Sequence, residues 1–255
     1  IADVTMTGEA AGNNFGISVS TAGDVNGDGY SDVIIGANGY SSSTGRVYVF
    51  FGDVSMNTIA DVIMTGEDIF NYYGNSVSRA GDVNGDGYSD IITGAWGFNS
   101  FTGRVYLYDY FMKNEIIPEI TFSGEAANNY FGIISAAGDV NGDGYSDVII
   151  GAPDFDNGQT NEGMAYVYHG SASGLSLISI WSADGNQVDA HFGNSVSTAG
   201  DVNGDGYSDV IIGAPYFDYG QTDEGVAYVY HGSDSGLSLT SNWLGEENQG
   251  DAFYG

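Results

Sequence analysis

A nine-residue segment, DVNGDGYSD, occurs four times without a change in this chain of 255 residues. The copies begin at Asp24, Asp82, Asp139 and Asp201, so their starting points lie 58, 57 and 62 residues apart. A period of this length corresponds to a small supersecondary unit, and self-similarity at such a period is typical of repeat architectures. The sequence therefore predicts a ring or stack of repeated modules.

Oxygen-bearing residues alternate along each copy of the segment. Side-chain oxygens occur at positions 1, 3, 5 and 9, and the backbone carbonyl at position 7 would complete the set. In the first copy Gly29, at position 6, permits the sharp bend with which a chain wraps around an ion. Oxygen donors alone favour calcium, with magnesium second because it prefers a tighter octahedron with retained waters. His, Cys and Met are absent from the segment, which excludes zinc and copper sites.

The same positions supply candidate ligands in every copy, which predicts about four calcium ions and no other cofactor. The expected ligands, with each tyrosine acting through its carbonyl, are Asp24, Asn26, Asp28, Tyr30, Asp32, Asp82, Asn84, Asp86, Tyr88, Asp90, Asp139, Asn141, Asp143, Tyr145, Asp147, Asp201, Asn203, Asp205, Tyr207 and Asp209. An EF-hand needs a glutamate at position 12, where this chain has Ile35, Thr93, Ile150 and Ile212. The competing interpretation is a metal-free turn, because Asp, Asn and Gly favour turns by themselves.

Short runs of β-branched and aromatic residues surround each segment. An alternating run precedes it, and three further runs follow, which in the first repeat are Val33–Ile35, Arg46–Phe51 and Ala60–Met64. Gly, Asn, Asp and Ser bound these runs, as they bound strands, and no window has a sustained helical period. Four strands in each repeat of roughly 60 residues are typical of a propeller blade. The predicted fold is an all-β propeller of four-stranded antiparallel blades, with at least four blades in this chain.

Two further motifs flank every segment. An aromatic residue followed by Gly stands upstream, at Phe15, Tyr73, Phe131 and Phe192, and a Gly-Ala pair stands downstream, at Gly36, Gly94, Gly151 and Gly213. The combination resembles the FG-GAP repeat of the integrin α-subunit propeller and its bacterial and archaeal relatives, over essentially the whole chain. The resemblance implies calcium in the hairpin between the first and second strands of each blade, and a complete ring of seven blades. Tyr73 in place of Phe, and Asn38 and Trp96 in place of Pro after Gly-Ala, affect only turn geometry.

The repeats extend over about 1–58, 59–116, 117–177 and 178–238, and a fifth begins within 239–255. Ile1–Gly8 matches Ile59–Gly66, so it is expected to be the outer strand of a preceding blade. The stretch around Trp243 is expected to supply the outer strand of the fourth blade. We therefore expect a single propeller, or a fragment of a larger ring whose further blades lie outside this chain. Ile1 in place of an initiator Met favours a mature or excised segment.

The chain carries 34 acidic and 4 basic residues, a formal net charge of −30. Such a charge excludes nucleic acid and anionic membrane surfaces as partners. Solubility is the simpler explanation of the acidity, and a preference for basic partners is the alternative. The absence of cysteine leaves the compartment open. Calcium loops of extracellular modules bind at about 0.1–1 mM, a concentration that the cytosol lacks, so an extracellular or cell-surface location is predicted, without membrane insertion.

The segments 153–163 and 215–225 are longer and more acidic than their counterparts in the first two repeats. Loops on a rigid scaffold often carry binding, so these segments either face a partner or are solvated turns. A further cation site is a third interpretation, with candidate ligands Asp154, Asp156, Glu162, Asp218, Asp223 and Glu224.

No catalytic residue is predicted. His169 and His231 occupy equivalent repeat positions, His191 has no counterpart, and no GxSxG motif is present. Paired carboxylates for glycoside hydrolysis stay an alternative because acids are plentiful. The favoured function is a calcium-rigidified module for protein recognition, adhesion or surface assembly. The second is a glycan-binding or accessory propeller of a larger secreted enzyme, in which Tyr40, Trp96, Phe98 and Tyr216 would stack on sugars.

Overall fold

The computed structural model describes residues 4–109, 117–246 and 249–255, which form four separate four-stranded antiparallel sheets. Blade 1 consists of β1 (Ser18–Gly23), β2 (Asp32–Ala37), β3 (Arg46–Phe50) and β4 (Val62–Thr65). Blade 2 consists of β5 (Ser76–Gly81), β6 (Asp90–Ala95), β7 (Arg104–Tyr108) and β8 (Ile120–Ser123). Blade 3 consists of β9 (Ile133–Gly138), β10 (Asp147–Ala152), β11 (Met164–Tyr168) and β12 (Trp181–Asp184). Blade 4 consists of β13 (Ser195–Gly200), β14 (Asp209–Ala214), β15 (Val226–Tyr230) and β16 (Trp243–Gly245).

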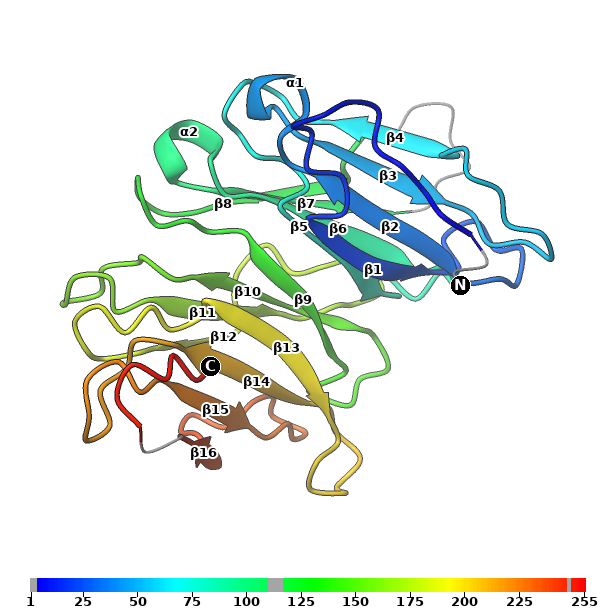
Figure 1. The fold of residues 1–255 in the computed structure, drawn as a ribbon. Coiled ribbons are helices and arrows are strands. Elements are labelled where there is room, and N and C mark those ends of the chain that lie inside the picture. Colours follow the sequence, from blue (N-terminus) through cyan, green and yellow to red (C-terminus); the bar gives the residue numbers. More distant parts are fainter. Residues whose placement is uncertain (1–3, 110–116, 247–248) are drawn as a thin grey trace.

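The four blades follow one another in an arc (Figure 1). Each sheet keeps its strands in sequence order, and the first strands of consecutive blades pack side by side, β1 on β5, β5 on β9 and β9 on β13. The predicted all-β propeller architecture with four-stranded blades is thereby confirmed. The stretch around Trp243 forms β16, the outer strand of blade 4, as expected.

The second strand of each blade lies in the core, as its unbroken apolar sequence predicts. Ile34, Ile92, Ile149 and Ile212 are fully buried. Large aromatic side chains fill the space between blades. Tyr73 is 1% exposed, and its hydroxyl is hydrogen bonded to that of Tyr108 at 2.8 Å.

The two flanking motifs of the sequence meet between blades. A Cβ placed on Gly36, from the Gly-Ala pair of blade 1, would lie 1.9 Å from the carbonyl oxygen of Gly74, which follows the aromatic residue of blade 2. Gly94 meets Gly132 in the same way, at 2.1 Å. Neighbouring blades therefore touch through bare backbone, which explains why glycine stands at both positions.

The sequence predicted no helix, whereas the described residues include two single-turn elements. These are α1 (Tyr40–Ser43) and α2 (Phe98–Phe101), between the second and third strands of blades 1 and 2. In α1, Ser41 and Ser42 have left-handed backbone angles, with φ of 48° and 60°. The following connection holds this turn, since the N–H of Tyr72 donates to the carbonyl of Ser43 at 2.8 Å.

The expected outer strand at Ile1–Gly8 is not formed within its described part. Residues 1–3 lie outside the described residues, and residues 4–8 belong to no strand. A strand needs a neighbouring ladder for its backbone groups, and no described strand pairs with this segment. In the described residues, no helix has the length and apolar character needed to cross a bilayer.

Candidate metal centre

Each nonamer forms the hairpin tip between the first and second strands of its blade. In the first, the Asp24 carboxylate accepts hydrogen bonds from the backbone N–H groups of Gly27, Asp28 and Gly29, at 2.7, 3.1 and 2.9 Å. Glycine permits this turn, because the φ angles of Gly27 and Gly29 are +77° and +89°. The other three loops repeat the same bonds from Asp82, Asp139 and Asp201.

The side chains at positions 3 and 5 are held facing each other. Asn26 accepts from the N–H of Asp28 at 3.0 Å and donates through Nδ2 to Oδ2 of Asp28 at 2.8 Å. Oδ1 of Asp28 accepts from the N–H of Tyr30 at 2.9 Å. Positions 1, 3 and 5 therefore place their oxygens within one exposed turn, as the alternation in sequence predicted.

The carboxylate at position 9 lies deeper than these three side chains, buried at the base of the loop. Asp32 is 1% exposed, and Asp90, Asp147 and Asp209 are fully buried. Asp147 accepts from the N–H groups of Val140 and Gly170, at 2.8 and 2.9 Å, so it ties the loop to the end of the third strand. Asp32 and Asp209 make the equivalent pairs of bonds.

Burial penalises the charged form of three of these carboxylates. It is the main reason why the pKa of Asp90 is raised to about 8 and that of Asp147 to about 7, and the acids at positions 1 and 5 of the same loops act in the same direction, as does Asp109 on Asp90. Burial likewise raises the pKa of Asp32. Oδ1 of Asp90 is buried and has no hydrogen-bond partner among the described residues. A cation beside the loop base is the addition that would stabilise the charged form.

The donor set fits a hard dication, with all candidate atoms being oxygen. Positions 1, 3, 5 and 9 of each loop would hold it, and the carbonyl at position 7 would be added from the backbone. Across residues 4–109, 117–246 and 249–255, no three side chains of His, Cys, Asp or Glu converge as a ready metal cluster. Their oxygens are hydrogen bonded to the loop backbone instead.

Successive loops interlock, a feature that our sequence reasoning missed. The N–H of Ser89 in loop 2 donates to the backbone carbonyl of Asp24 in loop 1 at 3.0 Å. The ring of Tyr88 covers Gly27, where a Cβ would lie 2.3 Å from the ring. Loops 3 and 4 pack on their predecessors in the same way. The sequence contained a signal for this contact. Gly at position 4, Tyr at position 7 and Ser at position 8 are identical in all four copies, although calcium binding needs none of their side chains.

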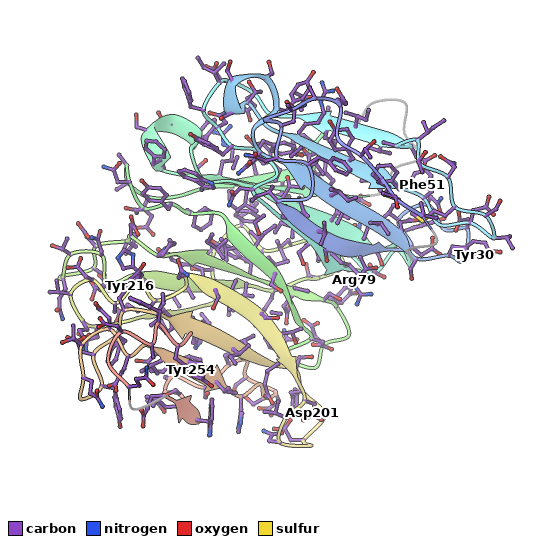
Figure 2. All side chains as sticks on the ribbon, viewed as in Figure 1. Tyr30, Phe51, Arg79, Asp201, Tyr216 and Tyr254 are labelled. Atoms are coloured by element: carbon purple, nitrogen blue, oxygen red, sulfur yellow. The ribbon has the colours of Figure 1, made fainter. Side chains whose placement is uncertain are left out.

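The row of the four described loops is uncovered at loop 1 and at loop 4. Tyr30, in loop 1, covers no glycine of another described loop and is 45% exposed. A Cβ placed on Gly204, in loop 4, would have no other atom within 4 Å. Figure 2 shows Tyr30 and Asp201 at the hairpin loops, and Tyr216 at the opposite ends of the strands.

The acids of the long loops stabilise the loops themselves. Glu162 is 1% exposed and accepts from the N–H of Gln159 at 3.2 Å, while Asp156 accepts from the N–H of Asn161 at 2.7 Å. Asp154 pairs with Nδ1 of His191 at 2.8 Å. These contacts are typical of turns that are stabilised by their own side chains. In the described part of the chain, no three His, Cys, Asp or Glu side chains converge here to hold a metal ion.

The model of the FG-GAP repeat matches four stretches, residues 15–50, 73–108, 131–168 and 192–230. The chain belongs to the FG-GAP repeat family. This FG-GAP chain is 33% identical to integrin alpha-4 of Xenopus laevis over 214 residues, covering 81% of the chain and 19% of that relative. It is 34% identical to integrin alpha-PS2 of Drosophila melanogaster, covering 74% of the chain and 14% of the relative. For integrin alpha-V of Gallus gallus the identity is 34%, and the shares are 66% and 16%. The chain thus spans less than a fifth of the length of these relatives.

Proposed function

We propose that this FG-GAP chain is an extracellular, calcium-rigidified module that takes part in protein recognition, adhesion or surface assembly. The observation that carries the proposal is the buried carboxylate at position 9, which lies beside two further acids in each of the four loops. Calcium would neutralise this charge and hold the hairpin tips, and so act structurally. Binding to a partner would use other loops, and no catalytic residue is proposed.

The integrin relatives support a protein partner and a cell-surface location, although they are matched over only part of their length. The loop chemistry supports the same compartment, because sites of this extracellular kind bind at about 0.1–1 mM calcium. A pull-down with the calcium-loaded chain would identify the partner.

A thermal melt in millimolar calcium, in equal magnesium and in chelator tests the proposal. We expect the melting temperature to be highest in calcium, intermediate in magnesium and lowest in chelator, because only the folded loops bind the ion. Native mass spectrometry should count about four calcium ions, one for each loop. Equal melting temperatures with and without calcium, and a metal-free mass, would contradict the proposal.

One observation favours glycan binding as a second candidate. Trp96 lies in a stack of rings, 4.4 Å from Tyr72, 5.1 Å from Tyr130 and 5.4 Å from Phe101 between centroids. These rings are half-buried and stacked on one another, so a sugar would contact the exposed edge of the stack. Tyr40 and Phe98 are less suited, because a guanidinium lies over each ring, at 3.5 and 3.6 Å. Calcium-dependent binding on a glycan array, lost in Trp96→Ala, would replace the protein-recognition proposal.

A further inference from the structure

The third strand of each blade leads into a residue that lies opposite the buried carboxylate at position 9. In blade 3 the ladder between β10 and β11 pairs Val148 with Tyr168. The next residues in this register are Asp147, at position 9, and His169. The ring of His169 contacts the loop, because its Nδ1 lies 3.1 Å from Nδ2 of Asn141 at position 3. The residue opposite position 9 therefore lies against the predicted metal ligands.

The residue at this position differs among the four blades. The same register places Phe51 there in blade 1, Asp109 in blade 2, His169 in blade 3 and His231 in blade 4. Like charges directly opposite each other in a ladder repel, so a carboxylate facing a carboxylate is unfavourable by itself. Of the four blades, blade 2 alone has two acids facing each other at the base of its loop.

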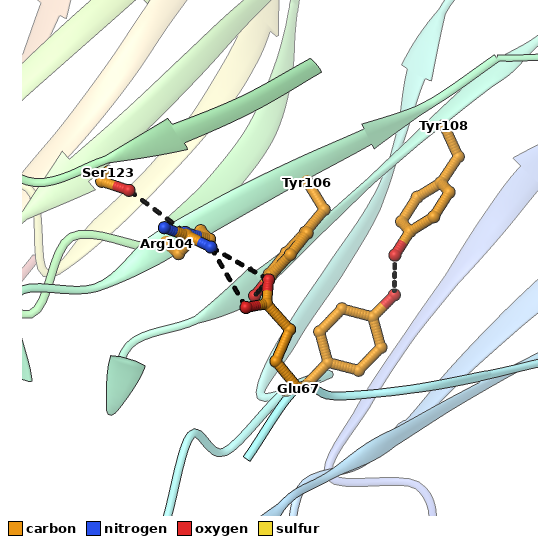
Figure 3. A network of polar contacts seen from close by, with 6 residues as sticks. Glu67, Arg104, Tyr106, Tyr108 and Ser123 are labelled. Carbon is orange, nitrogen blue, oxygen red and sulfur yellow. Dashed lines mark hydrogen bonds and ion pairs between the residues drawn. The ribbon is translucent and has the colours of Figure 1, made fainter. Parts of the chain in front are cut away.

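The strand that leads into Asp109 is fixed at both ends (Figure 3). At the start of β7, Nη1 of Arg104 pairs with Glu67 at 3.0 Å. At its end, the hydroxyl of Tyr108 is hydrogen bonded to that of Tyr73 at 2.8 Å. Asp109 follows Tyr108 directly, so a shift of the strand that separated the two acids would break both contacts.

The buried acid of the pair has an oxygen without a partner. Asp90 is fully buried, and its Oδ2 accepts from the N–H of Val83 at 2.8 Å. Oδ1 of Asp90 has no hydrogen-bond partner among the described residues. In the other three blades this oxygen accepts from a glycine N–H just beyond the third strand, that of Gly52, Gly170 or Gly232. A buried, unpartnered acceptor opposite a second carboxylate is the arrangement that a cation would complete.

The electrostatics of loop 2 agree with this geometry. Burial is the main cause of the raised pKa of Asp90, and among the neighbouring acids Asp109 acts more strongly than Asp86 and Asp82. The nonamer supplies three carboxylates to every loop, and Asp109 adds a fourth beside loop 2.

We propose that Asp109 is an additional ligand of the cation in loop 2, which makes this loop the tightest of the four calcium sites and the first to fill. The affinity of a calcium site rises with the charge of its ligands. The inference rests on the proposed calcium binding and adds to it a ligand from outside the nonamer.

An ion that fills loop 2 first would act on both neighbouring loops. Within this row, the N–H of Ser89 in loop 2 donates to the carbonyl of Asp24 in loop 1 at 3.0 Å. The N–H of Ser146 in loop 3 donates in turn to the carbonyl of Asp82 in loop 2 at 2.9 Å. Loop 2 is therefore held in contact with loops 1 and 3 at calcium concentrations that leave those loops empty.

A calcium titration of the whole chain, followed by nuclear magnetic resonance, tests the order of filling. The glycine at position 6 donates its N–H to the carboxylate at position 1, as Gly87 does to Asp82 at 3.0 Å, so its resonance reports on its own loop. The other reporters are Gly29, Gly144 and Gly206. We expect Gly87 to reach half of its change at a calcium concentration at least threefold below that of each other reporter. Simultaneous filling of all four loops would overturn this inference alone, whereas absence of calcium binding would overturn the proposed function as well.

Asp109→Asn removes the charge and keeps the shape of the side chain. We expect the affinity of loop 2 for calcium to fall at least threefold, to the level of the other loops, which should fill as before. In chelator at a pH above 8, the variant should melt at or above the wild-type temperature, because the repulsion between Asp109 and Asp90 is removed.

Asp234→Asn is the matched control, since it removes the same charge from an exposed residue outside the loops and should leave the order of filling unchanged. A merely structural role of Asp109 would give the opposite pattern, a lower melting temperature of Asp109→Asn in chelator with the order of filling retained. That pattern, or an unchanged affinity of loop 2 in Asp109→Asn, would overturn the proposal.

Discussion

At the residue scale, the four loops divide their acids into two classes. The carboxylate at position 5 is exposed and that at position 1 is half-buried in the first three loops; both organise the turn, whereas the one at position 9 is buried beneath it. The alternation of oxygen donors could be predicted from the sequence. The burial of the carboxylate at position 9 could not, because it depends on residues at the end of the third strand. Gly170, whose N–H donates to Asp147, lies 23 residues beyond it.

Asp90→Asn separates the electrostatic role of this position from its hydrogen bond. Oδ1 of Asp90 has no partner among the described residues, so an amide nitrogen fits there while the other atom still accepts from Val83. In chelator at a pH above 8, where Asp90 with its pKa of about 8 is charged, we expect the variant to be at least as stable as the wild type, because a buried charge is removed. In calcium it should bind one ion fewer and lose about 1.5 kcal/mol, the value for a site with a dissociation constant of ~0.1 mM at ~1–2 mM calcium.

Chemical denaturation and native mass spectrometry measure the two effects of Asp90→Asn. Asp234→Asn is the control, since Asp234 is exposed and lies outside the loops. An unchanged calcium count in Asp90→Asn would show that position 9 is not a ligand.

At the element scale, each hairpin depends on the next. The first copy of the nonamer receives both a backbone hydrogen bond and a tyrosine ring from the second. The strands and their order followed from short apolar runs at a fixed period, and the hairpin positions followed from the nonamers. The left-handed turns α1 and α2 could not be predicted, because residues such as Ser42 and Ser100 disfavour these angles intrinsically. The adjoining connection holds them there, since its N–H groups donate to the carbonyls of Ser42 and Ser100.

Gly142→Ala tests the contact between consecutive hairpins. A Cβ on Gly142 would lie 2.6 Å from the ring of Tyr207, so the two loops must separate. Gly204→Ala is a closely matched control, because its φ of +77° resembles the +73° of Gly142 while its surroundings are open. Both variants should lose about 1–2 kcal/mol from the backbone conformation.

Only Gly142→Ala should lose a further ~1–3 kcal/mol from overpacking. Urea denaturation in calcium measures the difference between the two variants. Equal losses would mean that the ring adjusts freely and that the hairpins are not mechanically linked.

At the scale of the whole molecule, the arc presents complementary ends. Tyr30 is exposed at one end, and the uncovered Gly204 lies at the other, the two halves of a contact that is made three times within the arc. The sequence predicted the repeat and its period. It did not identify this complementarity, which appears only when the loops are stacked in space.

We expect two copies of this 255-residue stretch, expressed by itself, to associate head to tail through these ends at high concentration. Tyr30 of one copy would cover Gly204 of the next, as Tyr88 covers Gly27 within the arc. Sedimentation velocity should then detect dimers or longer assemblies in calcium, and Tyr30→Ala should reduce them. A single monomeric species across the whole concentration range would contradict this expectation.

The glycine contacts between blades set the angular pitch of the arc. Because Gly36 and Gly74 meet without an intervening side chain, main-chain dimensions alone fix how far one sheet rotates from the next. A longer connection between the second and third strands does not change this angle. The segments 153–163 and 215–225 are examples, because blades 3 and 4 form the same four-stranded sheets as blades 1 and 2. New recognition segments can therefore be inserted after Ala37 or Ala95 without changing the angle between neighbouring blades.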